Sequence, residues 1–142
     1  MRAPARHHAV RATQPSRYLA DIFGGTGGVA RHASSMGILG QVWDTAVSPT
    51  LDITTPRNLR HLTRDARDGV LAAAMIAPEC RSRSIARMRT NVIRSASEPG
   101  GVACPPRPFS HNEVTVLERG NKQIRAVLQL LETLLIYRVP WA

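Results

Sequence analysis

An apolar run that ends in a cluster of glycines is the feature that most limits what this chain can fold into. Residues 18–23 are expected to form a short buried strand, residues 24–28 a turn, and residues 29–36 a helix. The turn consists of Gly24, Gly25, Thr26, Gly27 and Gly28. Glycine is expected there because the backbone must take positive φ values and approach a ligand closely, which a Cβ atom would prevent. Ordinary tight turns use similar glycines, so the flanking strand and helix are what favour a nucleotide-like cofactor.

The rest of the 142-residue chain continues the alternation of strands and helices. Residues 38–43 and 70–76 are apolar runs of strand length, and Thr55 followed by Pro56 is typical of a helix start. A long helix with an apolar face is predicted from the capping box of Ser110 and Glu113 to about residue 137. The predicted apolar face comprises Val114, Leu117, Ile124, Val127, Leu128, Leu131, Leu134 and Leu135. This order predicts an α/β domain of Rossmann type, with three layers around a parallel sheet.

The chain is strongly basic, with a formal net charge of +9, and Lys122 is its only lysine. Arginine at this density suits phosphate contacts, although a biased base composition of the coding sequence gives the same pattern. Residues 1–16 contain arginines and no acidic residue, which is typical of a disordered basic leader or of an organelle transit peptide. The two cysteines give neither a disulfide framework nor metal-ligand spacing. We therefore expect an intracellular protein of the nucleus or cytoplasm, with no bound metal and no membrane-spanning segment.

A second basic segment, residues 81–108, is rich in arginine, proline and glycine, and we expect a long loop with at most one helical turn. Loops of this length in compact domains are usually functional or disordered. The candidate nucleic-acid-binding residues lie here and are Arg81, Arg83, Arg87 and Arg89. The alternative interpretation is a solvated connector that binds nothing.

Polar and aromatic residues follow the predicted strands at the edge where an open parallel sheet binds its ligands. Trp43 and Asp44 end the second strand, Asp52 and Ile53 lie in the next loop, and Cys80 follows the third strand. An acidic side chain in such a place is suited to ribose hydroxyls, and an indole offers a face to adenine. Each residue also has a purely structural interpretation, with Asp44 as a turn former, Trp43 as core and Asp52 as a loop cap.

In this order the motifs resemble those of the S-adenosylmethionine-dependent DNA cytosine carbon-5 methyltransferases, over residues 18–84. Phe23 and the glycine turn are similar to the family's first motif, which lies under the methionine part of the cofactor. Trp43-Asp44 is similar to the second motif, which holds ribose and adenine. Asp52-Ile53-Thr54 is similar to the third motif, whose aspartate contacts the adenine amino group. The resemblance implies S-adenosylmethionine as the cofactor and DNA as the partner.

Pro78-Glu79-Cys80 falls where the family has the Pro-Cys motif of its nucleophile, so the resemblance implies that Cys80 attacks carbon-6 of cytosine. The chain departs from the family at Glu79, which separates proline from cysteine, and at Val42, which stands where the family has the acidic ribose ligand. Residues 139–141 resemble the start of the strand on which the family has a glutamate that protonates the cytosine ring. The sequence ends before such a glutamate. General acid assistance is worth about 10²–10⁴-fold, so we expect little turnover from this chain alone.

Two other classes of function stay open at this point. A non-catalytic basic module that binds nucleic acid would use the arginines without the cofactor pocket, and a fragment of a larger polyprotein is a further alternative. A dinucleotide-dependent oxidoreductase would need Gly-x-Gly-x-x-Gly spacing, which the Gly-Gly-Thr-Gly-Gly cluster lacks. The hypothesis that we follow is a partial methyltransferase-like Rossmann domain over residues 17–142, with an incomplete sheet and one long C-terminal helix.

Overall fold

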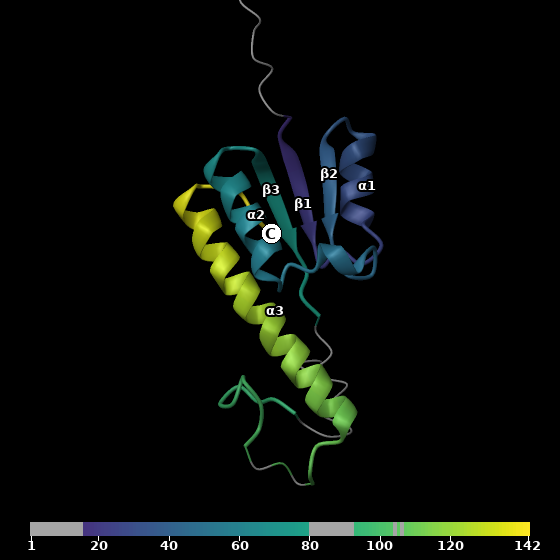
Figure 1. The fold of residues 1–142 in the computed structure, drawn as a ribbon, viewed down its shortest axis with the longest axis vertical. Coiled ribbons are helices and arrows are strands. Elements are labelled where there is room, and N and C mark those ends of the chain that lie inside the picture. Colours follow the sequence, from purple (N-terminus) through teal and green to yellow (C-terminus); the bar gives the residue numbers. More distant parts are fainter. Residues whose placement is uncertain (1–15, 80–92, 104, 106) are drawn as a thin grey trace, which may run out of the picture.

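The computed structural model describes residues 16–79, 93–103, 105 and 107–142. Within these residues the sheet has three parallel strands in the order β2-β1-β3, namely β1 (Tyr18–Ile22), β2 (Leu39–Trp43) and β3 (Leu71–Ile76). Helix α1 (Gly28–Ser35) lies on one side of the sheet, and α2 (Pro56–Arg67) and the long α3 (His111–Ile136) lie on the other (Figure 1). The predicted three-layer Rossmann-like fold, with an incomplete sheet and a long C-terminal helix, is confirmed.

Strand β1 lies between the other two strands and is the most buried element of the sheet. Tyr18, Ala20 and Ile22 of β1 have at most 2% of their surface exposed. They pack in one apolar core with Leu62 of α2, Leu71 of β3 and the inner residues of α3. An apolar run that is covered on both faces is expected of the central strand of a parallel sheet.

The three strands end at the same edge of the sheet. Ile22, the last residue of β1, pairs with Trp43 of β2 on one side and with Ile76 of β3 on the other. The chain runs from β1 outward to β2 and then returns past β1 to β3, so this edge is where the strand order reverses. Open α/β sheets bind their ligands in the crevice outside such a reversal. The residues that follow the strands therefore converge where a ligand site is expected.

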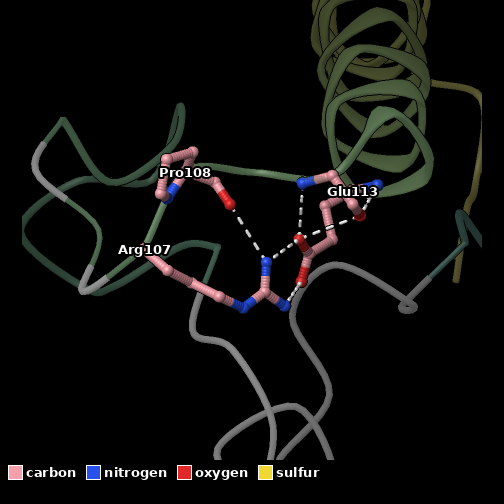
Figure 2. A network of polar contacts seen from close by, with 4 residues as sticks. Arg107, Pro108 and Glu113 are labelled. Carbon is pink, nitrogen blue, oxygen red and sulfur yellow. Dashed lines mark hydrogen bonds and ion pairs between the residues drawn. The ribbon is translucent and has the colours of Figure 1, made fainter.

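Helix α3 begins at the predicted capping box, which an arginine reinforces (Figure 2). Ser110 Oγ accepts a hydrogen bond from the Glu113 N–H at 3.3 Å, and Glu113 Oε2 accepts one from the Ser110 N–H at 2.9 Å. Arg107 donates to both carboxylate oxygens of Glu113, at 2.9 and 3.0 Å, and also to the carbonyl of Pro108 at 3.0 Å. The buried carboxylate of Glu113 is thus fully paired, which fixes where α3 starts.

The buried face of α3 differs from the predicted apolar face. Val114, Leu128 and Leu135 were expected inside but are 37%, 61% and 65% exposed. The residues that are buried are Glu113, Val116, Gly120, Gln123, Ala126, Val127, Leu130 and Leu134. The two polar residues of this stripe are buried with partners: Glu113 pairs with Arg107 and Ser110, and Gln123 accepts a hydrogen bond from the Glu79 N–H.

Two segments flank α3 in the described part of the chain. The residues of the predicted basic loop that are described, 93–103, 105, 107 and 108, contain no helix or strand, as expected. After α3, Trp141 forms an isolated parallel bridge with Ala74 of β3, where the sequence indicated the start of a further strand. The Ala74 N–H donates to the carbonyl of Pro140 at 3.0 Å, and the Ile76 N–H donates to that of Ala142 at 2.8 Å. Nearly all of the predicted leader, residues 1–15, lies outside the described residues.

Candidate cofactor site

The glycine turn has the unusual backbone that its sequence predicted. Gly25 and Gly27 have φ values of 58° and 77°, and Phe23 also has a positive φ of 57° although it bears a side chain. The Phe23 N–H donates to the carbonyl of Trp43 at 3.0 Å, which holds this strained residue against the end of β2. Backbone strain of this kind concentrates at functional sites.

At two of the glycines, the missing Cβ is not explained by the predicted close approach to a ligand. A Cβ atom on Gly24 would lie 2.2 Å from Asp21 Oδ1, and one on Gly27 would lie 2.4 Å from Val42 Cγ2. At these positions the protein's own side chains exclude a Cβ atom, so no ligand is needed to explain the glycines. A Cβ on Gly25 or Gly28 would meet no atom within 4 Å, so of the four glycines in the turn only these two face open space.

Asp21 is a buried carboxylate whose role the sequence did not reveal. It is the next-to-last residue of the apolar strand β1 and is 1% exposed. Its Oδ2 accepts a hydrogen bond from the Ala30 N–H at 3.0 Å, in the first turn of α1. The residue that caps this helix, Gly27, has no side chain to do so. Asp21 therefore provides the capping acceptor from the neighbouring strand, and an acidic residue inside an apolar strand was the available signal.

Asp44 connects the end of β2 to the glycine turn. Its Oδ2 accepts a hydrogen bond from the Gly25 N–H at 2.9 Å, and its Oδ1 accepts one from the Ala46 N–H at 2.7 Å. These two bonds to backbone N–H groups confirm the interpretation of Asp44 as a turn former. Each carboxylate oxygen has a second lone pair, so Asp44 is still able to accept a hydrogen bond from a ligand hydroxyl.

Asp52 is held rigidly in the loop after the short helix at Pro49–Leu51. Its Oδ1 accepts two hydrogen bonds from Thr54, from the N–H at 2.8 Å and from the hydroxyl at 2.7 Å. Its carbonyl accepts further bonds from the side chains of Thr55 and Asn58, both at 2.9 Å. Both side-chain bonds end on Oδ1, so Oδ2 has no partner among the described residues. The loop thus presents one available carboxylate oxygen from a fixed backbone.

A cavity of about 950 Å³ lies at the edge of the sheet where the strands end. Its apolar lining is formed by Phe23, Trp43, Leu51, Ile53 and Ala77. Its polar lining on the sheet side is formed by Asp44, Thr45, Asp52, Thr54 and Glu79. Helix α3 forms the remaining wall with Thr115, Glu118, Arg119, Asn121, Lys122, Gln123 and Arg125. This volume lies within the usual range for sites of small molecules and cofactors.

The structure brings half of the predicted cofactor residues into this cavity. Phe23, Trp43, Asp44, Asp52 and Ile53 all line it. Gly24, Gly25, Thr26, Gly27 and Gly28 are not among the residues that line it, although the bond from Gly25 to Asp44 joins the turn to its wall. The candidate nucleophile Cys80 and the candidate nucleic-acid contacts Arg81, Arg83, Arg87 and Arg89 lie outside the described residues.

Trp43 is mostly buried and packs against His61, which belongs to a network of polar side chains next to the cavity. It is 7% exposed, and its ring centre lies 5.5 Å from that of His61 on α2. His61 Nε2 lies 3.2 Å from Asp65 Oδ2, which also accepts a hydrogen bond from the Tyr18 hydroxyl at 2.8 Å. Burial, followed by this bond to Asp65, raises the pKa of Tyr18 far above its ordinary value. The indole N–H of Trp43 is buried without an acceptor among the described residues.

Helix α3 holds Glu79, which follows β3 and borders the cavity. The Glu79 N–H donates to Oε1 of the buried Gln123 at 3.1 Å, and Arg119 Nε lies 3.6 Å from Glu79 Oε2. The described part of the loop from residue 93 onward is fixed to the same part of α3 by Arg94, which is 8% exposed. Arg94 donates to the carbonyl of Leu117 at 2.8 Å and to Asn121 Oδ1 at 2.6 Å. Sequence patterns gave no signal for Gln123 or Arg94, because both act through tertiary contacts.

Within the described ranges, no three or more His, Cys, Asp or Glu residues come together as a potential metal site. Over the same residues, every helix is too short or too polar to cross a lipid bilayer. Comparisons of the chain with protein-family models, with curated proteins and with solved structures found no match.

Proposed function

We propose that this chain is a cofactor-binding domain of an S-adenosylmethionine-dependent methyltransferase of the DNA cytosine carbon-5 type. The observation that supports it most is the convergence of Trp43, Asp44 and Asp52 on one cavity at the carboxyl edge of a parallel sheet. These three residues belong to two separate sequence motifs, and the fold brings both motifs to the place where such sheets bind nucleotides.

The residues of the cavity suit an adenosyl group. Trp43, Leu51 and Ile53 supply an apolar end for the adenine ring, and Asp52 Oδ2 is an available acceptor for its amino group. Asp44 is placed to accept from a ribose hydroxyl at the end of β2. The loop around Asp52 needs little rearrangement because its backbone and one carboxylate oxygen are already hydrogen-bonded, which lowers the entropic cost of binding.

When bound, the cofactor supplies an activated methyl group. The chain's own contribution is to hold the adenosyl end, and to exclude water from it with the apolar lining. The family resemblance assigns the nucleophile to Cys80, which follows the segment that Gln123 holds at Glu79. The positive charge of the chain suits a nucleic-acid substrate.

Isothermal titration of the chain with S-adenosylhomocysteine tests this proposal. The informative variant is Asp52→Asn, because an amide keeps the acceptor for Thr54 but replaces Oδ2 with an amino group that repels the adenine amino group. We expect the variant to weaken binding by about 10- to 100-fold, the effect of losing a hydrogen bond to a charged group. The matched control is Asp68→Asn at the exposed residue that follows α2, and this variant should bind like the wild type.

Absence of binding to the wild-type chain, or equal binding by Asp52→Asn, would contradict the proposal. If the wild-type chain instead binds DNA with steep salt dependence and does not bind S-adenosylhomocysteine, the non-catalytic nucleic-acid module is the better account.

A further inference from the structure

Two cations on the α3 wall of the cavity have no acidic partner among the described residues. Lys122 and Arg125 both line the cavity and are both exposed. They lie three positions apart on the helix, a separation that places the two side chains on neighbouring turns of one face, about 5–6 Å apart at Cβ. No ion pair within 4.0 Å joins either of them to a carboxylate of the described chain.

Their neighbours on the same wall are already engaged. Arg119 lies against Glu79, and Gln123 accepts from the Glu79 N–H. The side chain of Asn121 accepts from Arg94 and donates to the carbonyl of Gly100 at 2.9 Å. These groups hold loops onto α3. Lys122 and Arg125 hold nothing within the described structure, although they face the same cavity.

We propose that Lys122 and Arg125 bind the phosphate groups of a nucleic-acid strand at the mouth of the cavity. The proposal rests on the proposed function in one respect, that the cavity is where the substrate meets the cofactor. The two side chains suit phosphate, since the guanidinium of Arg125 binds oxyanions with two donors and the ammonium of Lys122 is a compact point charge. None of the candidate nucleic-acid contacts expected from the sequence lies on α3.

A polyanion fits these residues better than a small anion does. Both side chains are exposed, so each pairs with a solvated anion at high dielectric and gains little from a single charge. A nucleic-acid strand offers successive phosphates and releases its condensed counterions when these are neutralised, which is a gain that a lone anion lacks. The net charge of +9 adds long-range attraction in the same direction. Glu118 lies on the same wall and should weaken the contact by repulsion.

The decisive experiment measures how binding to a short DNA duplex depends on salt. The wild-type chain is compared with the double variant Lys122→Gln/Arg125→Gln, and the logarithm of the binding constant is plotted against the logarithm of the salt concentration. Each phosphate contact contributes a slope of about 0.9, so the loss of two contacts should reduce the slope by about 1.8. The affinity at about 0.1 M salt should fall by about tenfold or more, since the same counterion release is lost.

The chain offers a matched control on α2. Arg57 and Arg60 are also exposed and also three positions apart, but they do not line the cavity. The variant Arg57→Gln/Arg60→Gln removes the same net charge, so it should leave the slope nearly unchanged if the contacts are local. Equal slopes for the two double variants would overturn the proposal, because the salt dependence of DNA binding would then reflect the net charge of the protein alone.

Two further measurements do not depend on the stability of the double variant. The variant Glu118→Gln removes a repulsive charge from the wall and should strengthen DNA binding, and weaker binding would count against the proposal.

Since Lys122 is the only lysine, reductive methylation followed by mass spectrometry reports on its accessibility directly. DNA should protect Lys122 from methylation. Inorganic phosphate at the same total phosphate concentration should not, and equal protection by both would overturn the assignment to a nucleic acid.

The outcome is separable from that of the cofactor experiment. The DNA measurements are made without S-adenosylhomocysteine, so the change in slope is read independently of cofactor binding. A slope that is reduced by Lys122→Gln/Arg125→Gln but not by Arg57→Gln/Arg60→Gln supports the present proposal. An unchanged DNA slope overturns it and leaves the proposed function standing, whereas a chain that never binds S-adenosylhomocysteine but shows the slope change refutes only the proposed function.

Discussion

The carboxylate of Asp21, in the central strand, accepts a hydrogen bond from the backbone N–H of Ala30, in the first turn of α1, at 3.0 Å. This bond joins the strand before the glycine turn to the helix after it, so the shape of the turn is fixed from within the protein. A buried carboxylate without such a donor would be costly. Gly24 belongs to the same arrangement, because its missing Cβ leaves the space that the Asp21 side chain occupies.

The variant Asp21→Ala should therefore lower the free energy of unfolding by about 1–3 kcal/mol, since the Ala30 N–H loses its buried acceptor. The variant Asp21→Asn should cost less because its amide oxygen can still accept. Urea unfolding measures both. The exposed Asp68 is the control, and Asp68→Ala should stay within about 0.5 kcal/mol of the wild type. An equally small effect of Asp21→Ala would show that the bond does not stabilise the fold.

Two glycines of the turn should respond oppositely to alanine. Gly24→Ala should destabilise the protein by about 1–3 kcal/mol, because the new Cβ would lie 2.2 Å from Asp21 Oδ1. Gly28→Ala should be neutral or stabilising by about 0.4–1 kcal/mol, because its Cβ meets no atom within 4 Å and its φ is not positive. Thermal unfolding compares the two. In a double-mutant cycle, Asp21→Ala should relieve part of the Gly24→Ala cost, and strict additivity would contradict the steric explanation.

Stability at high pH should depend on Tyr18. Burial and the hydrogen bond to Asp65 raise the pKa of Tyr18 above its ordinary value of about 10. The unfolded chain then loses this proton near pH 10 while the folded chain keeps it, so folding stability is complete below about pH 10 and falls above it. The limiting slope is about 1.4 kcal/mol per pH unit. Urea unfolding from pH 8 to 11 should show a shallower decline for Tyr18→Phe, and identical declines would refute the assignment.

The start of α3 should depend on the pair in Figure 2. Glu113→Gln removes the charge that Arg107 binds with two hydrogen bonds, and we expect a loss of about 1–2 kcal/mol in the free energy of unfolding. Arg107 is 55% exposed, which limits the effect through solvent screening. Glu132→Gln, at an exposed position of the same helix, should change stability by less than about 0.5 kcal/mol. Circular dichroism during urea unfolding reports both, and equal effects would contradict a special role for Glu113.

The sequence predicted the elements better than the contacts between them. Helix starts were correct where a local signal sets them, as with Thr55-Pro56 and with the capping box at Ser110. The buried face of α3 was predicted incorrectly at Leu128 because the covering elements, which include a loop fixed by the buried Arg94, are distant in sequence. The reason for Gly24 was also mistaken, since a sequence does not reveal which atoms a missing Cβ would meet.

At the candidate site, too, the sequence predicted the positions of the strand ends better than the contacts between distant elements. Strand ends and parallel topology predict that Trp43 and Asp52 approach one edge, and both line the cavity there. The α3 wall was not foreseen, because Gln123, Lys122 and Arg125 reach the cavity only through the packing of α3 against α2. Helical periodicity gives the spacing of such residues but not the element that they face.

The most direct test of the proposed cofactor site uses the two tryptophans as separate reporters. In a ¹H–¹⁵N correlation spectrum, the indole N–H groups of Trp43 and Trp141 give two signals that the variant Trp141→Phe assigns. Trp43 lines the cavity and Trp141 does not. Titration with S-adenosylhomocysteine should shift the Trp43 signal and leave that of Trp141 in place. A spectrum in which neither signal moves at saturating ligand, or in which only Trp141 responds, would contradict the account.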